Sequence, residues 1–144
     1  MPRIIRTPAA ARDWMRELSR KGATTLPPDH VAVQGHCAGS VARAYCNAAA
    51  GYVDAHAMID AVSAAGKIRR NTKAPLGAVM MWRGGKHGHV ALAARFGYIW
   101  TVDLPRSNRI GRVRRALVRE RWGYQYVGWC LAEDIPGWSK LRRA

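Results

Sequence analysis

The first half of the chain has the spacing of amphipathic helices. Apolar residues recur every three to four positions in three runs, which predict helices over residues 8–21, 37–50 and 54–65. In the first run Thr7 is a suitable N-cap, Pro8 occupies a position where a missing N–H costs nothing, and Gly22 supplies a left-handed stop. Gly51 and Gly66 are the predicted stops of the other two helices.

The second half changes to strand patterns. Short apolar or alternating runs predict strands over residues 75–82, 88–94, 98–103 and 124–131, and residues 106–121 predict a basic loop with a short helix. A three-residue hairpin loop, Arg95-Phe96-Gly97, would place His89 opposite Asp103 on neighbouring strands. Helices followed by strands predict an α+β fold, with N-terminal helices packed on a mostly antiparallel sheet.

The length of 144 residues and the apolar content of 49% predict one domain with a real core, and they exclude intrinsic disorder. We divide it into an N-terminal helix and linker (1–33), a core (34–131) and a tail (132–144). No run approaches the roughly 18 apolar residues of a membrane span. The arginine-containing N-terminus lacks the apolar stretch of a secretory signal.

The strongest global signal is a net charge of +15. Such a charge favours an anionic partner, which can be nucleic acid, an acidic membrane surface or a polyanionic wall polymer. Residues 106–121 contain seven arginines, among them Arg112, Arg114 and Arg115. This segment is interpreted either as an anion-binding edge near a groove or as a solvated face.

Cys37 is the first candidate for chemistry, because it opens a predicted helix and a helix N-terminus stabilises a thiolate. The alternative is a small buried apolar residue, which is also our interpretation of Cys46 and Cys130. His89 is the best-placed base and Asp103 would orient its imidazole. A zinc set of Cys37, His87 and His89 lacks a fourth ligand, so neither metal nor cofactor is predicted.

Four segments together resemble the CHAP and NlpC/P60 cysteine peptidases. They are GHCAGSVARAY around Cys37, the strand PLGAVMMW, the run GHVAL with His89, and WGYQYVGW near the end. The resemblance implies a reduced papain-like fold with Cys37 as nucleophile, His89 as base and Asp103 as the third polar residue. It departs from many NlpC/P60 members, which have Asp-Cys-Ser-Gly where this chain has His36-Cys37-Ala38-Gly39.

An oxyanion hole of the backbone N–H of Cys37 and the side chain of Gln34 is expected by likeness to papain-like enzymes. Further residues are candidates for substrate binding: Trp82, His36, Arg112, Arg114 and Arg115.

The resemblance implies hydrolysis of an amide bond in bacterial peptidoglycan, by an amidase or an endopeptidase. The expected partners are peptidoglycan and anionic wall polymers, reached through phage lysis, a virion or another export route. Two alternatives remain open. One is a non-catalytic basic protein that binds nucleic acid, and the other is the same fold acting on a protein substrate as a protease or toxin.

Overall fold

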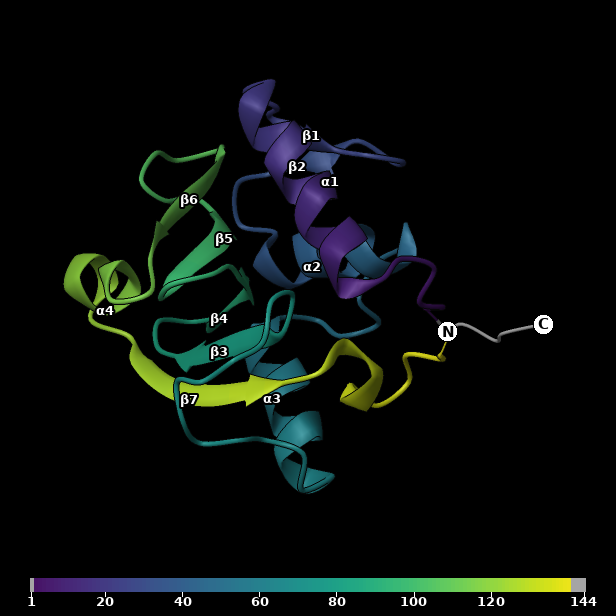
Figure 1. Cartoon of the computed structure of the whole chain (residues 1–144), viewed down its shortest axis with the longest axis vertical. Helices are drawn as coiled ribbons and strands as arrows, with labels where there is room; N and C mark the ends of the chain where they lie inside the picture. Colours follow the sequence, from purple (N-terminus) through teal and green to yellow (C-terminus); the bar gives the residue numbers. More distant parts are fainter. Residues whose placement is uncertain (1, 141–144) are drawn as a thin grey trace.

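A five-stranded antiparallel sheet organises the chain, which is described here over residues 2–140 of a computed structural model (Figure 1). The strand order is β6-β5-β4-β3-β7. The strands of this sheet are β3 (Val79–Arg83), β4 (His89–Ala93), β5 (Tyr98–Val102), β6 (Ile110–Arg114) and β7 (Gln125–Cys130). The predicted combination of helices and antiparallel sheet is confirmed.

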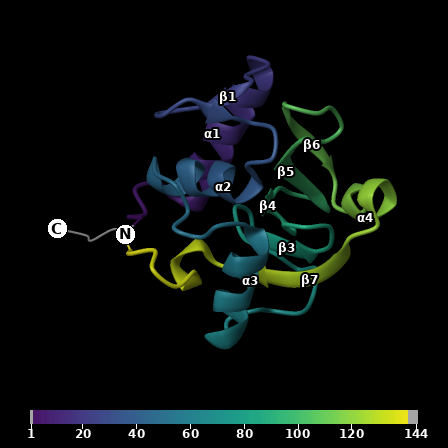
Figure 2. The ribbon, with the colours of Figure 1, turned by 180° about the vertical axis from the view of Figure 1, so that it is seen from behind.

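The helices cover the two faces of the sheet unequally. They are α1 (Pro8–Arg20), α2 (Cys37–Cys46), α3 (Ala55–Ala64) and α4 (Leu117–Trp122), with a single 3-10 turn at Ala132–Asp134. Figures 1 and 2 show α1 and α2 on one side of the sheet and α4 on the other.

Alternation along the strands divides the interior into two cores. Val90 and Leu92 of β4 pack with α1, α2 and α3 in what we call the helix-side core. Ala91 and Ala93 of the same strand, with Val118 of α4, belong to what we call the outer core. A residue on β4 is therefore assigned to one face or the other by its position in the strand.

The helix boundaries follow local capping chemistry. The Thr7 hydroxyl accepts a hydrogen bond from the Ala10 N–H (3.2 Å), as expected for an N-cap, and Asp54 caps α3 by accepting from the Ala57 N–H (2.8 Å). The helix α2 ends earlier than predicted. Asn47 adopts a left-handed conformation (φ 52°) and stops it four residues before Gly51.

Two strand features were not predicted. Residues 106–121 were expected to form a loop with a short helix, but they contain β6 as well as α4. Arginines occupy the exposed positions of β6 and obscure the alternation, although Ile110 and Val113 are buried. A small hairpin of β1 (Thr25–Leu26) and β2 (Val31–Ala32) lies within the predicted N-terminal linker.

Segments on both sides of residues 34–131 pack in the helix-side core, and residues 141–144 of the predicted tail lie outside the described residues. Met15 of α1 and Trp138 near the C-terminus are both buried in the helix-side core. The Trp138 indole N–H donates to the Ala50 carbonyl (2.9 Å), and the Ser139 N–H donates to the Pro2 carbonyl (3.0 Å). Both ends of the described chain therefore pack against the same core.

A substitution at Gly111 tests the packing between β6 and the loop after β5. A Cβ at this position would lie 2.1 Å from the Leu104 carbonyl oxygen, which is closer than atoms can approach. We expect Gly111→Ala to lower the free energy of unfolding by about 1–3 kcal/mol in urea denaturation. Ser63→Ala on the exposed face of α3 is the control and should change it by less than about 0.5 kcal/mol. Equal stability of the two variants would contradict this packing.

Candidate active site

Cys37 is the first residue of α2, as predicted, and is 9% exposed. The backbone N–H groups of Val90 and Ala38 are directed at its thiol. Its carbonyl accepts a hydrogen bond from the Ser40 hydroxyl (2.7 Å). The thiol thus lies between the start of α2 and strand β4, on the helix side of the sheet.

Burial governs the acidity of this thiol. It raises the pKa of Cys37 to about 11, because a thiolate would lose its hydration there, and the nearby charge of Asp103 raises it further. The backbone N–H groups of Val90, Ala38 and Cys37 itself lower this pKa, each with a smaller effect than burial. Cys37 is therefore a neutral thiol near pH 7, in contrast to the lowered pKa that its position at a helix N-terminus predicts.

His89 belongs to the other face of the sheet. Its ring centroid lies 5.9 Å from that of Trp82 and 5.0 Å from that of Trp122, both of which pack in the outer core. Its Nε2 atom is 2.6 Å from the Thr101 hydroxyl oxygen, and burial lowers the pKa of the imidazole to about 4. The neighbouring Val90 contacts α2, so strand alternation directs His89 away from it.

Asp103 does not orient His89. The strands have the predicted register, with Leu92 opposite Trp100 and the Ala94 N–H bonded to the Tyr98 carbonyl (2.8 Å). Asp103 nevertheless adopts a positive φ of 65° just beyond β5. Its two carboxylate oxygens accept from the N–H groups of Gly35 (2.8 Å) and Asn108 (2.7 Å). The predicted register is therefore correct within the paired part of β4 and β5, but the predicted His89–Asp103 pair is wrong, because the backbone turns at Asp103 beyond the end of β5.

A different histidine, His87, lines the same cleft as Cys37. A cleft of about 330 Å³ is lined by Cys37, His36, Asp54 and His87, among other residues. His87 Nδ1 is 3.1 Å from the Asp54 Oδ2 atom. The N–H of Ala57 lowers the pKa of Asp54, and the imidazole of His87 lowers it further, so this carboxylate is ionised at neutral pH.

The turn that carries His87 is fixed to the start of α3. The His56 N–H donates to the His87 carbonyl (2.8 Å), and the Gly84 N–H donates to the His56 ring Nε2 (3.3 Å). A Cβ on Gly88 would lie 2.3 Å from the His56 ring, and Gly88 has a φ of 72°. Only glycine allows this close approach, which holds His87 next to Asp54.

The remaining predicted site residues fall in different places. Gln34 is exposed, its backbone N–H donates to the Asn108 side-chain oxygen, and its carbonyl lies 3.1 Å from His36 Nδ1. Trp82 is 1% exposed and packs against Tyr126, so it cannot contact a substrate as predicted.

The three predicted substrate-binding arginines do not line the Cys37 cleft. The guanidinium of Arg112 lies 4.0 Å from the centroid of the Tyr98 ring, and that of Arg114 lies 3.7 Å from Glu120. Arg115 lines a separate groove on the outer face.

Sequence reasoning missed the Asp54–His87 pair because 33 residues separate its members. The available signals were an aspartate at a helix N-cap and a histidine in a glycine-rich turn, and neither of them specifies the other. His36, a predicted substrate-binding residue, lines the cleft with Cys37.

Within residues 2–140, no group of three or more His, Cys, Asp or Glu residues is arranged to hold a metal ion. In the same part of the chain, no helix is long and apolar enough to cross a membrane. A scan of protein-family models, a search of curated proteins and a search of solved structures each gave no match.

The thiol pKa values predict a pH profile for alkylation. The thiolate fraction rises about 10-fold per pH unit below the pKa, so labelling of Cys37 by iodoacetamide should rise by this factor per unit from pH 7 to pH 10. Cys130, which is fully buried with a pKa raised to about 12, should react more slowly than Cys37 at every pH. Peptide mass spectrometry measures both rates. A Cys37 rate that levels off at pH 7 would show a low pKa instead.

The two carboxylate contacts of Asp103 predict a role in stability. Asp103→Ala removes the acceptors of Gly35 and Asn108 and should lower the free energy of unfolding by about 1–3 kcal/mol. Asp103→Asn should lower it less, because asparagine keeps one carbonyl acceptor and tolerates a positive φ. Urea denaturation measures both. The assignment is contradicted if both variants keep wild-type stability.

Proposed function

We propose that this protein is a thiol hydrolase that cleaves an amide bond of bacterial cell-wall peptides in the cleft beside α2. Cys37 is the nucleophile, His87 the base and Asp54 the residue that orients the base. The observation that carries the proposal is that a cysteine at the start of a helix and a carboxylate-bound histidine line the same cleft.

The chemistry follows from the protonation states. The Asp54 carboxylate accepts the proton on Nδ1 of His87, which leaves Nε2 as the basic atom. Since Cys37 is a neutral thiol, its proton passes to Nε2 as sulfur attacks the amide carbonyl carbon. The backbone N–H of Cys37 and the side chain of Gln34 are our candidates for stabilising the oxyanion.

The intermediate then collapses. The C–N bond breaks while the imidazolium of His87 gives its proton to the leaving amine, and a thioester on Cys37 remains. His87 next removes a proton from water, whose oxygen attacks the thioester. The C–S bond breaks, the acid product leaves and the Cys37 thiol regains its proton. In this scheme His89 is a structural residue held by Thr101.

The substrate class rests on the resemblance to the CHAP and NlpC/P60 peptidases. The finer fold assignment, a reduced papain-like fold, is supported by a cysteine that opens α2 and by the packing of α2 on an antiparallel sheet. The charge of +15 suits a wall that carries anionic polymers, to which phage lysis, a virion or another export route would deliver the enzyme.

The decisive experiment compares variants on purified bacterial cell walls. Wild type should release soluble fragments whose new termini, read by mass spectrometry, identify the bond. Cys37→Ala should release none, and His87→Ala and Asp54→Asn should each be at least about 100-fold slower. His30→Ala is the matched control, an exposed histidine outside the cleft that should leave the rate unchanged.

Two outcomes separate the parts of the proposal. If Cys37→Ala releases fragments as fast as wild type, the hydrolase is excluded. If a folded His89→Gln variant is inactive while His87→Ala is fully active, the hydrolase stands and the base is His89. Circular dichroism establishes folding in each variant.

A further inference from the structure

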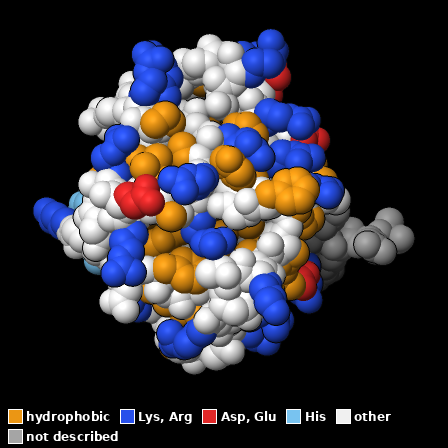
Figure 3. Space-filling view, turned by 60° about the vertical axis from the view of Figure 1, so that its left-hand side comes forward, with side chains coloured by type: hydrophobic (Ala, Val, Ile, Leu, Met, Phe, Trp, Pro, Cys, Tyr) orange, Lys and Arg blue, Asp and Glu red, His pale blue; other side chains and the backbone are white. Residues whose placement is uncertain are grey.

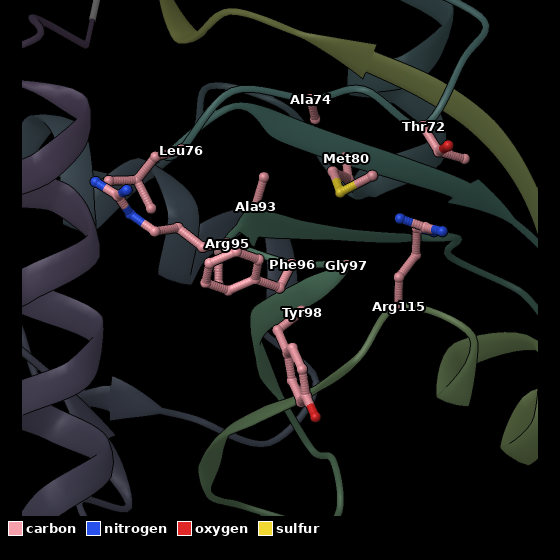
Figure 4. Close-up of a pocket in the computed structure, with 11 residues that line it drawn as sticks. Thr72, Ala74, Leu76, Met80, Ala93, Arg95, Phe96, Gly97, Tyr98 and Arg115 are labelled. Carbon is pink, nitrogen blue, oxygen red and sulfur yellow. The ribbon is translucent and has the colours of Figure 1, made fainter.

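The outer face of the sheet carries a second concave surface, a groove of about 510 Å³ beside the β4–β5 hairpin (Figure 4). We call it the hairpin groove. Met80 and Ala93, both buried residues of the outer core, lie among its lining residues. The Cys37 cleft is lined from the helix side instead, so an inference about the hairpin groove does not rest on the proposed hydrolase.

An exposed aromatic ring is the first unusual feature of this groove. Phe96, the only phenylalanine of the chain, lines the groove and is 90% exposed at the tip of the hairpin. Tyr98 lines the same groove from the start of β5. Contact with water does not stabilise an exposed phenylalanine ring, whereas the ring can stack its π face on a planar ligand.

Positive charge is the second feature. Arg95 and Arg115 line the groove, and no acidic residue is among its lining residues. Neither arginine forms an ion pair with any carboxylate of residues 2–140. Figure 4 shows the two side chains on opposite sides of Met80 and Phe96. On the α4 side of the molecule, apolar areas alternate with Lys and Arg (Figure 3).

Backbone hydrogen bonds fix the main chain that carries these groups. The Arg115 N–H donates to the Gly97 carbonyl (2.8 Å), and the Tyr98 N–H donates to the Arg95 carbonyl (3.3 Å). The guanidinium of Arg112 lies over the Tyr98 ring and adds another positive charge nearby. Aromatic faces and arginines are therefore held together on one short loop and the strand end next to it.

We propose that the hairpin groove binds single-stranded nucleic acid. A base stacks on Phe96 against the apolar lining, and the phosphates on either side of it contact Arg95 and Arg115. Stacking surfaces beside positive charge are how proteins hold single strands without reading their sequence. A polyanion without rings would account for the arginines but would leave Phe96 unexplained, and a duplex would hide its base faces.

Fluorescence anisotropy with a labelled 12-nucleotide oligo(dT) tests the proposal. Phe96→Ala should weaken binding about 10-fold or more, and Phe96→Leu should weaken it similarly because leucine is apolar but has no ring. Phe96→Trp should retain affinity. Ile5→Ala, which truncates another exposed apolar side chain, is the control and should bind as wild type does.

The charge component has its own matched control. Arg95→Gln with Arg115→Gln should weaken binding and reduce the slope of log affinity against log salt by about 0.7 for each phosphate that the variant no longer neutralises. Arg3→Gln, which removes an exposed arginine that lies outside the groove and likewise forms no ion pair with residues 2–140, should leave the slope nearly unchanged.

Three results would overturn the proposal. The first is wild-type affinity in both Phe96→Ala and Phe96→Leu. The second is displacement of the oligonucleotide by a glycerol-phosphate polymer at equal phosphate concentration, which would identify a polyanion site without base stacking. The third is Phe96-dependent binding to phosphatidylglycerol vesicles that excludes the oligonucleotide, which would identify a membrane contact.

Discussion

Strand β4 is the constraint on which the arrangement of both surfaces depends. Because alternate residues of a strand face opposite sides, Val90 and Leu92 support α2 while Ala91 and Ala93 support the outer core. The start of α2 lies against the backbone of β4, and this contact buries the Cys37 thiol. The same strand continues into the hairpin that presents Phe96. The candidate active site and the hairpin groove are therefore built on opposite faces of one sheet.

The elements of the fold were largely predictable because their signals are local. Thr7 and Asp54 cap helices through bonds to residues three positions away, and the Arg95-Phe96-Gly97 loop set the correct strand register. The strand β6 was not predicted, because its exposed positions are arginines held by Tyr98 and Glu120 from other elements. An edge strand of this kind is stabilised by contacts that are not encoded in its own pattern.

The candidate site was less predictable because it depends on the direction of each side chain as well as on which residues pair across the strands. Cys37 was identified from its place at a helix start, but its pKa depends on burial by distant segments. The loop predicted the register of Leu92 and Ala93 with β5 correctly, but Asp103 lies just beyond β5, where its positive φ directs its carboxylate to the loop before α2 and not to His89. The Asp54–His87 contact joins a helix cap to a turn, and no sequence period connects the two.

The contact between the two ends of the described chain has a consequence for assembly. The Ile4 N–H donates to the Ser139 carbonyl (2.9 Å), and the Ser139 N–H donates to the Pro2 carbonyl. These two backbone hydrogen bonds hold the two ends of the described chain side by side. Adjacent termini allow a fold to be inserted into a surface loop of another protein with little strain on either. Because residues 2–4 and 139 lie side by side and do not line the Cys37 cleft or the hairpin groove, insertion into another protein would leave these two surfaces accessible.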